Sequence, residues 1–117
     1  MKILFILNEA PYGTEKTYNA LRLAMALQKD SPEIQVRIFL MADAVSAAIS
    51  NQKTPDGYYN IERMLKSVIH KGAEVQLCGT CCDARGIKSL PLLEGCNIGT
   101  MSLLSLWTIE SDKVLTF

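Results

Sequence analysis

Apolar runs alternate along this chain with segments that have helical spacing. The apolar runs predict four strands, at residues 2–7, 35–41, 73–78 and 113–117. The first run, KILFIL, is almost continuously apolar, which is typical of a strand buried on both faces of a parallel sheet. Helical spacing is clearest within residues 61–69, where apolar residues recur at i, i+3, i+4, i+7 and i+8: Ile61, Met64, Leu65, Val68 and Ile69.

Polar residues that favour helix N-termini precede each helical segment. These candidate caps are Thr14, Asp43, Asn60 and Thr100. We expect helices from 14 to about 28, over 44–49, 61–71 and 100–110, with one short turn near 83–85. Gly72 is expected to follow the third of the longer helices at the position that favours a left-handed backbone. Residues 90–99 remain open between a connector and a short extended piece.

The alternation of strands and helices predicts an α/β fold. We expect one three-layer α/β/α domain over residues 1–117, with a mainly parallel sheet of about five strands flanked by helices. Reactive groups in such sheets gather beyond the carboxyl ends of the strands. Three segments are predicted to meet there: residues 8–13, residues 42–43 and the stretch LCGTCCDARGI at 77–87.

Charge and hydropathy narrow the range of partners. Twelve basic and twelve acidic residues cancel, and no basic stripe is present, so nucleic-acid binding is not expected. No apolar run approaches the length of a membrane span, and the run at 3–7 is too short for a signal peptide. We therefore expect a cytoplasmic protein. The zero net charge and the broad apolar surface of the first helix favour a homo-oligomer.

Three of the four cysteines lie within residues 78–82. Cytoplasmic thiols stay reduced, so this cluster indicates metal binding, redox chemistry, nucleophilic chemistry or packing. A zinc site needs four ligands, and the remaining candidates, Cys82, Cys96 and His70, do not complete a zinc-binding pattern. No metal is therefore predicted. The spacing of Cys78 and Cys81 is also that of a redox dithiol, but the helix that follows is too short for the usual redox motif.

A nucleophilic thiol requires a lowered pKa. Cys78 ends a strand and precedes a short helix, where helical N–H groups and the nearby Arg85 favour a thiolate, whereas Asp83 opposes it. Such a thiolate can hold a terminal sulfur as a persulfide, which backbone N–H groups would stabilise. Packing is the alternative: Cys96 is expected to be a packing residue, and Cys82 stays open between the two roles.

Four further residues are candidates for a pocket beside Cys78. Asn8 and Tyr12 follow the first strand and either line that pocket or form an ordinary strand-end turn. Asp43 is either a pocket acid or, as we favour, a helix N-cap. Arg85 either steadies a thiolate or persulfide or forms a surface ion pair. No glycine-rich nucleotide fingerprint is present, and no cofactor is expected.

The ordered set of segments resembles the DsrE/DsrF-like family, specifically its YchN-like branch. The resemblance rests on NEAPYG (8–13), RIFLMADAV (37–45), GYYNIERML (57–65), LCGTCCDARGI (77–87) and WTIESDKVLTF (107–117). It implies a small α/β domain that assembles into trimers or hexamers. Relatives include the TusBCD sulfur relay and the DsrEFH proteins of sulfur oxidation. The relay subunits do not share the NEAPYG loop in this form.

The resemblance also implies roles for the cysteines. In the sulfur-carrying relay subunit the acceptor lies eight residues before the glycine of an Arg-Gly pair, which here is Cys78 before Gly86. Cys81 matches a second cysteine of the branch and would assist or resolve a persulfide, whereas Cys82 has no expected counterpart. We therefore hypothesise a sulfurtransferase-like sulfur carrier with donor and acceptor proteins as partners. The alternatives are a non-catalytic oligomeric binding module with packing thiols and, third, a dithiol redox or metal-binding protein.

Overall fold

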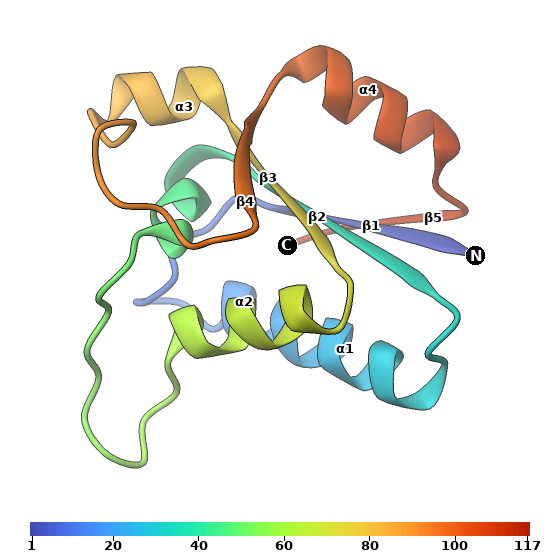
Figure 1. The fold of residues 1–117 in the computed structure, drawn as a ribbon, viewed down its shortest axis with the longest axis horizontal. Helices are drawn as coiled ribbons and strands as arrows, with labels where there is room; N and C mark the ends of the chain where they lie inside the picture. The colour runs from blue at the N-terminus through green and yellow to red at the C-terminus, as the bar shows by residue number, and fades with distance from the viewer.

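A single five-stranded sheet organises the molecule. The computed structural model describes residues 1–117, and the sheet has the spatial order β4-β3-β2-β1-β5 with every neighbouring pair parallel (Figure 1). The predicted α/β class with a sheet of about five strands is therefore confirmed. The strands are β1 (Lys2–Leu7), β2 (Gln35–Leu40), β3 (Glu74–Cys78), β4 (Cys96–Gly99) and β5 (Lys113–Thr116).

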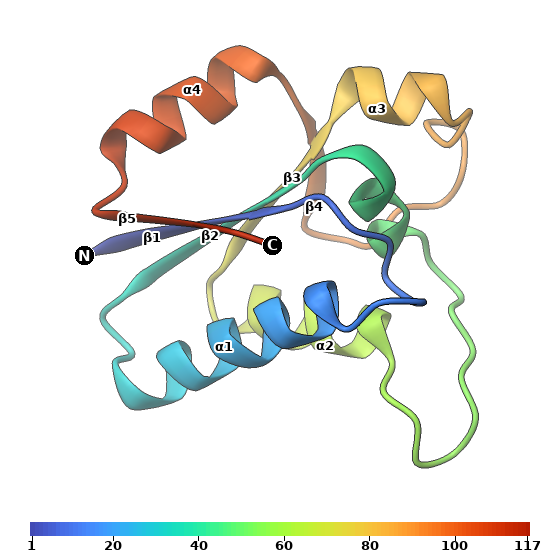
Figure 2. The ribbon, with the colours of Figure 1, turned by 180° about the vertical axis from the view of Figure 1, so that it is seen from behind.

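Helices cover both faces of this sheet, which gives the expected three layers. The helical segments are α1 (Lys16–Asp30), the 3-10 helix η1 (Ala42–Ala48), α2 (Ile61–His70), α3 (Gly79–Ala84) and α4 (Met101–Glu110). Helices α1 and α2 lie on one side, α3 and α4 on the other, and both views show the same arrangement (Figures 1 and 2). None of the helices combines the length and the apolar character needed to cross a membrane.

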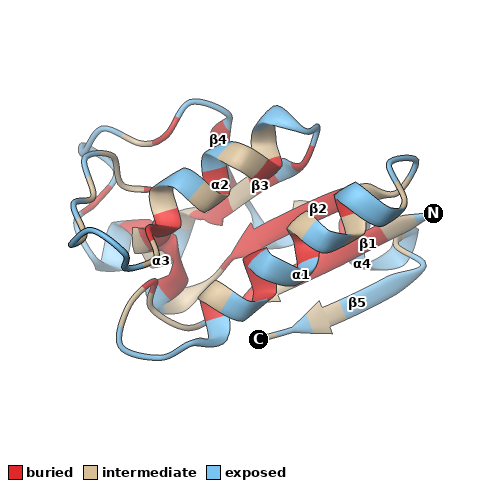
Figure 3. Ribbon diagram, turned by 90° about the horizontal axis from the view of Figure 1, so that it is seen from below, coloured by how far each residue is buried: buried red, intermediate tan, exposed pale blue.

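The core lies along the central strands. β1 and β2 are largely buried, whereas β5 at the edge is mostly exposed (Figure 3). Phe5 and Phe39 are among the largest fully buried side chains. Trp107 of α4 packs edge-on against Phe39, with ring centroids 6.0 Å apart, so it joins α4 to the sheet. The continuous apolar pattern of residues 2–7 thus marks a strand that is covered on both faces.

Of the four predicted helix caps, Asn60 and Thr100 form, whereas Thr14 and Asp43 do not. Asn60 accepts a hydrogen bond from the Arg63 N–H at 3.0 Å, and Thr100 caps α4 in the same way. Gly72 follows α2 with φ of +99°, as expected. Helix α1, however, begins at Lys16 without a side-chain cap. The N-cap role favoured for Asp43 is also wrong, because Asp43 lies inside η1 and pairs with a side chain of another segment, as described below.

The cysteine stretch differs from expectation in where its helix begins. The sequence predicted a turn near 83–85, but α3 starts at Gly79, directly after β3. Cys81 and Cys82 are therefore helical residues, and Cys78 is the N-cap of α3. Residues 90–99, left open between connector and strand, contain β4. This strand pairs with β3 in a register that places Gly99 beside Cys78.

Candidate functional site

Cys78 lies at the carboxyl end of β3, where an open cavity borders the sheet. The cavity has a volume of about 310 Å³. The side chain of Cys78 is largely covered, with 7% of the residue exposed, but it forms part of the cavity wall. The lining residues come from the end of β2 and the residue after it, from β3, from α3 and the segment that follows it, and from the β4–α4 junction: Phe39, Met41, Cys78, Gly79, Thr80, Asp83, Lys88, Ile98, Gly99, Thr100 and Met101.

Hydrogen-bond donors surround the sulfur atom of Cys78. The backbone N–H of Cys81 donates to Cys78 Sγ at 3.3 Å, and Thr80 Oγ1 lies 3.2 Å from the same atom. Burial raises the pKa of the Cys78 thiol, but the hydrogen bonds from Cys81 and Thr80 outweigh burial and hold that pKa below its ordinary value. Cys78 is the one cysteine of the chain whose pKa is shifted in this direction.

Cys81 lies one turn further along and faces both Cys78 and η1. Its Sγ accepts a hydrogen bond from the Ala42 N–H at 3.3 Å, and Ala42 has a positive φ of 48°. Burial and the hydrogen bond with Cys78 raise the pKa of Cys81. Within this pair, therefore, Cys78 is the thiol whose pKa is lowered and Cys81 is the thiol whose pKa is raised.

The other two cysteines lie inside the core. Cys82 is fully buried, and Cys96 is 9% exposed. Burial raises the pKa of Cys82, and it raises the pKa of Cys96 to about 12. Both side chains belong to the hydrophobic cluster and, unlike Cys78, neither lines the cavity, so packing describes their surroundings. No group of three or more His, Cys, Asp or Glu side chains is placed to hold a metal ion.

Asp43 and Arg85 pair with each other next to Cys81. Arg85 Nε lies 3.0 Å and its terminal nitrogen 2.9 Å from Asp43 Oδ1, and the guanidinium also donates to the Cys81 carbonyl at 3.1 Å. Arg85 therefore joins η1 to α3. Its charge lowers the pKa of Cys81, although burial and Cys78 have larger effects in the opposite direction. Neither Asp43 nor Arg85 lines the cavity.

Asn8 and Tyr12 do not line the cavity beside Cys78. The Tyr12 hydroxyl donates to Gln52 Oε1 at 2.7 Å and accepts from the Ile61 N–H at 3.0 Å, so these partners fix its direction toward α2. The Asn8 side chain donates to the Phe117 carbonyl at 3.4 Å. The polar groups of both side chains are therefore used in hydrogen bonds to residues outside the cavity, as in an ordinary strand-end turn with a half-buried tyrosine.

Sequence reasoning missed most of the cavity wall. Thr80, Lys88 and the apolar residues Phe39 and Ile98 line it, but none of them was a candidate. The available signal was topological: if residues 96–99 form a strand parallel to β3, the residues after Ile98 must lie at the same edge of the sheet as Cys78. The sequence pattern of residues 90–99 does not distinguish a connector from a strand, and it therefore does not assign their neighbours to the site.

The pKa order of the thiols predicts a specific pH dependence of labelling. Alkylation requires the thiolate, so labelling rises as the pH rises through the pKa. Cys78 should therefore reach half of its maximal labelling rate at a lower pH than Cys81, because its pKa is lowered whereas that of Cys81 is raised. The measurement is the rate of iodoacetamide labelling of the native protein at several pH values, read separately for each cysteine by peptide mass spectrometry.

Thr80→Val is the matched variant for this experiment. Valine has a similar shape but lacks the hydroxyl that stabilises the Cys78 thiolate, so the labelling curve of Cys78 should move to higher pH. The curve of Cys96, which has no contact with Thr80, should not move. An unchanged Cys78 curve in this variant would show that the hydroxyl does not stabilise the thiolate.

Comparison with known proteins identifies the family. The DsrE/DsrF-like family pattern matches residues 1–117. Protein YchN of Escherichia coli K12 is 48% identical over 116 residues, covering 99% of this chain and 98% of that protein. The YchN crystal structure matches with a TM-score of 0.95 over the same shares of the two chains.

More distant relatives agree with this assignment. An uncharacterised protein of Methanocaldococcus jannaschii is 42% identical over 117 residues, which is 100% of both chains. A structure of a protein of unknown function from Methanobacterium thermoautotrophicum is 13% identical, has a TM-score of 0.78 and covers 97% of both chains, which shows a shared fold. The chain therefore belongs to the DsrE/DsrF-like family.

Proposed function

We propose that this protein accepts sulfane sulfur on Cys78 as a persulfide and passes it to a partner protein in the cytoplasm. The observation that carries the proposal is the position of Cys78 Sγ, which forms part of the wall of an open cavity and lies within hydrogen-bond distance of two donors. Membership of the DsrE/DsrF-like family supports a role related to sulfur relay.

The transfer is a pair of thiolate attacks. The Cys78 thiolate attacks the outer sulfur of a donor persulfide, R–S–SH, so that a new S–S bond forms and the donor leaves as the thiolate R–S⁻. The Cys78 persulfide is then attacked at its outer sulfur by an acceptor thiolate, which takes the sulfur and releases the Cys78 thiolate. The Cys81 N–H and the Thr80 hydroxyl stabilise negative charge at Cys78 Sγ at both stages.

Cys81 offers a second fate for the loaded sulfur. Its thiol is hydrogen-bonded to Cys78, and when deprotonated it can attack Cys78 Sγ. That attack forms a Cys78–Cys81 disulfide and releases the outer sulfur as HS⁻, so the sulfane sulfur itself is reduced and no separate oxidant is needed. The raised pKa of Cys81 keeps this reaction slow near neutral pH, which preserves the persulfide for an acceptor.

The test is direct detection of the loaded sulfur. Purified protein is treated with inorganic polysulfide, free thiols and persulfides are trapped by alkylation, and each cysteine is examined by peptide mass spectrometry. We expect the mass of one additional sulfur atom on the peptide at Cys78. Loading on Cys82 or Cys96 instead, or no loading at all under conditions where a small-molecule thiol reacts, would contradict the proposal.

We further propose that copies of this chain assemble through α4. Four of the exposed large apolar side chains belong to α4 or β4, and they are Ile98, Met101, Leu106 and Ile109. Ile109 is 79% exposed, which is costly for an isolated chain in water. Sedimentation should show a trimer or hexamer at micromolar concentration, and Ile109→Glu should shift it toward the monomer. A stable wild-type monomer would contradict this assembly.

A further inference from the structure

The cavity beside Cys78 contains a single pair of opposite charges. Lys88 Nζ lies 3.0 Å from Asp83 Oδ1 and 3.1 Å from Asp83 Oδ2, and no other lining residue is charged. We propose that this pair binds the α-ammonium and α-carboxylate groups of a free amino acid persulfide, and that this zwitterion is the sulfur donor. The inference rests on the proposed function, because it names the donor for Cys78.

The ion pair has the bonding capacity that such a ligand needs. The Lys88 ammonium carries three N–H groups, and the Asp83 carboxylate has acceptor sites beyond those used by Lys88. Both side chains are partly exposed, at 46% for Lys88 and 61% for Asp83. A ligand carboxylate can therefore accept from Lys88 while its ammonium donates to Asp83, and both groups stay at the wet rim of the cavity.

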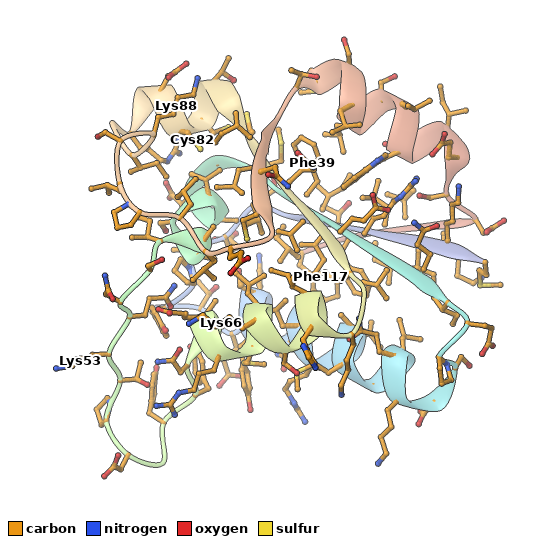
Figure 4. The ribbon with its side chains drawn as sticks, in the orientation of Figure 1. Phe39, Lys53, Lys66, Cys82, Lys88 and Phe117 are labelled. Atoms are coloured by element: carbon orange, nitrogen blue, oxygen red, sulfur yellow. The ribbon has the colours of Figure 1, made fainter.

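Gly79 has no side chain, and it therefore leaves open the space between Lys88 and Ile98 next to Cys78. A Cβ atom at Gly79 would lie 3.9 Å from Lys88 Nζ and 3.1 Å from Ile98 Cγ2, so any other residue would occupy the space between them. Gly79 directly follows Cys78, and Lys88 lies over α3 (Figure 4). A small ligand can therefore bind Lys88 by its head group while its side chain points toward Cys78 Sγ.

The rest of the wall favours a small and largely apolar side chain. Phe39, Met41, Ile98 and Met101 form its apolar part. A volume of about 310 Å³ lies at the lower end of the range for small-molecule sites. The charges of Lys88 and Asp83 match the two charges of an amino acid head group, whereas a small dianion such as thiosulfate would leave the Asp83 carboxylate facing negative charge. A cysteine-type persulfide meets each requirement.

Binding can be measured without sulfur transfer. The probe is S-methyl-L-cysteine, which has the zwitterionic head group and an unreactive thioether, titrated against the full-length protein by NMR. We expect Lys88→Met and Asp83→Asn each to weaken binding about fivefold or more. The matched control is Lys66→Met, because Lys66 lies on α2, across the sheet from Lys88, and pairs with Glu62 (Figure 4).

Two analogues test the recognition of each charge. S-methylcysteamine lacks the carboxylate, and the N-acetyl derivative of S-methyl-L-cysteine lacks the ammonium. Both should bind at least about fivefold more weakly than S-methyl-L-cysteine to the wild type. Equal binding of all three compounds, or equal binding of the parent compound to wild type and Lys88→Met, would overturn the inference.

Sulfur loading separates this inference from the proposed function. Cysteine persulfide should load Cys78 of the wild type faster than inorganic polysulfide does at the same concentration, and Lys88→Met should reduce this preference, because polysulfide has no amino acid head group. Polysulfide loading without a preference for cysteine persulfide would overturn the donor assignment and leave the proposed function intact. Selective binding of S-methyl-L-cysteine without any loading of Cys78 would support the amino acid site and overturn the sulfur-carrier function.

Discussion

Replacing Cys78 with alanine should abolish sulfur uptake, lowering the sulfur bound from a persulfide donor by at least about a hundredfold. Alanine removes the atom to which the donor sulfur bonds, and no other thiol combines a lowered pKa with a place on the cavity wall. Cys81 is the nearest substitute, but burial and Cys78 raise its pKa, so it would attack slowly. The measurement is donor-dependent mass gain of the intact protein at neutral pH.

Variants of two other cysteines provide the controls for this experiment. Cys96→Ala removes a buried thiol outside the cavity and should leave sulfur uptake at the wild-type level. Cys81→Ser should load Cys78 but release less HS⁻ from the loaded protein, because the resolving thiol is absent. Wild-type uptake by Cys78→Ala would show that the sulfur is held by another group, and the proposed carrier role of Cys78 would then be wrong.

Replacing Phe39 with alanine should destabilise the protein by about 3–5 kcal/mol. Phe39 is 1% exposed, packs edge-on against Trp107 and contributes to the cavity wall. It also lies close to β4, since a Cβ atom at Gly99 would be only 3.2 Å from Phe39 Cε2. The variant therefore loses packing between β2, β4 and α4 at once. Urea denaturation followed by circular dichroism measures the free energy of unfolding.

Phe117→Ala provides the comparison for Phe39→Ala. Phe117 follows β5 at the end of the chain, is only partly buried and stacks on Phe5 with centroids 6.0 Å apart (Figure 4). The same chemical change should therefore cost less stability there, because the surrounding chain has more freedom to relax. Equal losses for the two variants would show that Phe39 does not have the special packing role assigned to it.

The fold can be predicted from the sequence where the local preference of a segment agrees with its place in the tertiary structure. The apolar run at 2–7 is buried on both faces, and Asn60 caps α2 through its own side chain. The start of α3 was missed because Gly79, Thr80 and Cys81 have weak helix propensity. Their helix begins where the Cys81 N–H can donate to Cys78 Sγ, a contact that helical propensity does not encode.

The candidate site was predicted at its sulfur atoms but not at its walls. Cys78 could be found because three cysteines crowd the end of an apparent strand, and parallel topology places that end at the functional edge. Tyr12 was placed at the correct edge of the sheet, yet the direction of its hydroxyl depends on Gln52, forty residues away. No sequence pattern indicates that Lys88 lines the cavity, because its position near Gly79 depends on the path of the chain after α3.

The hydrogen bonds of Gln52 indicate where this chain tolerates inserted residues. Its side chain donates to the carbonyls of Ala47 and Ile49 and accepts from Tyr12 and from the Glu62 N–H. These bonds fasten the base of the segment 51–59 to four other residues, while its tip at 55–57 is exposed. Extra residues spliced in at that tip, such as an epitope tag or a fluorescent reporter, would thus leave the anchored base and the distant Cys78 undisturbed.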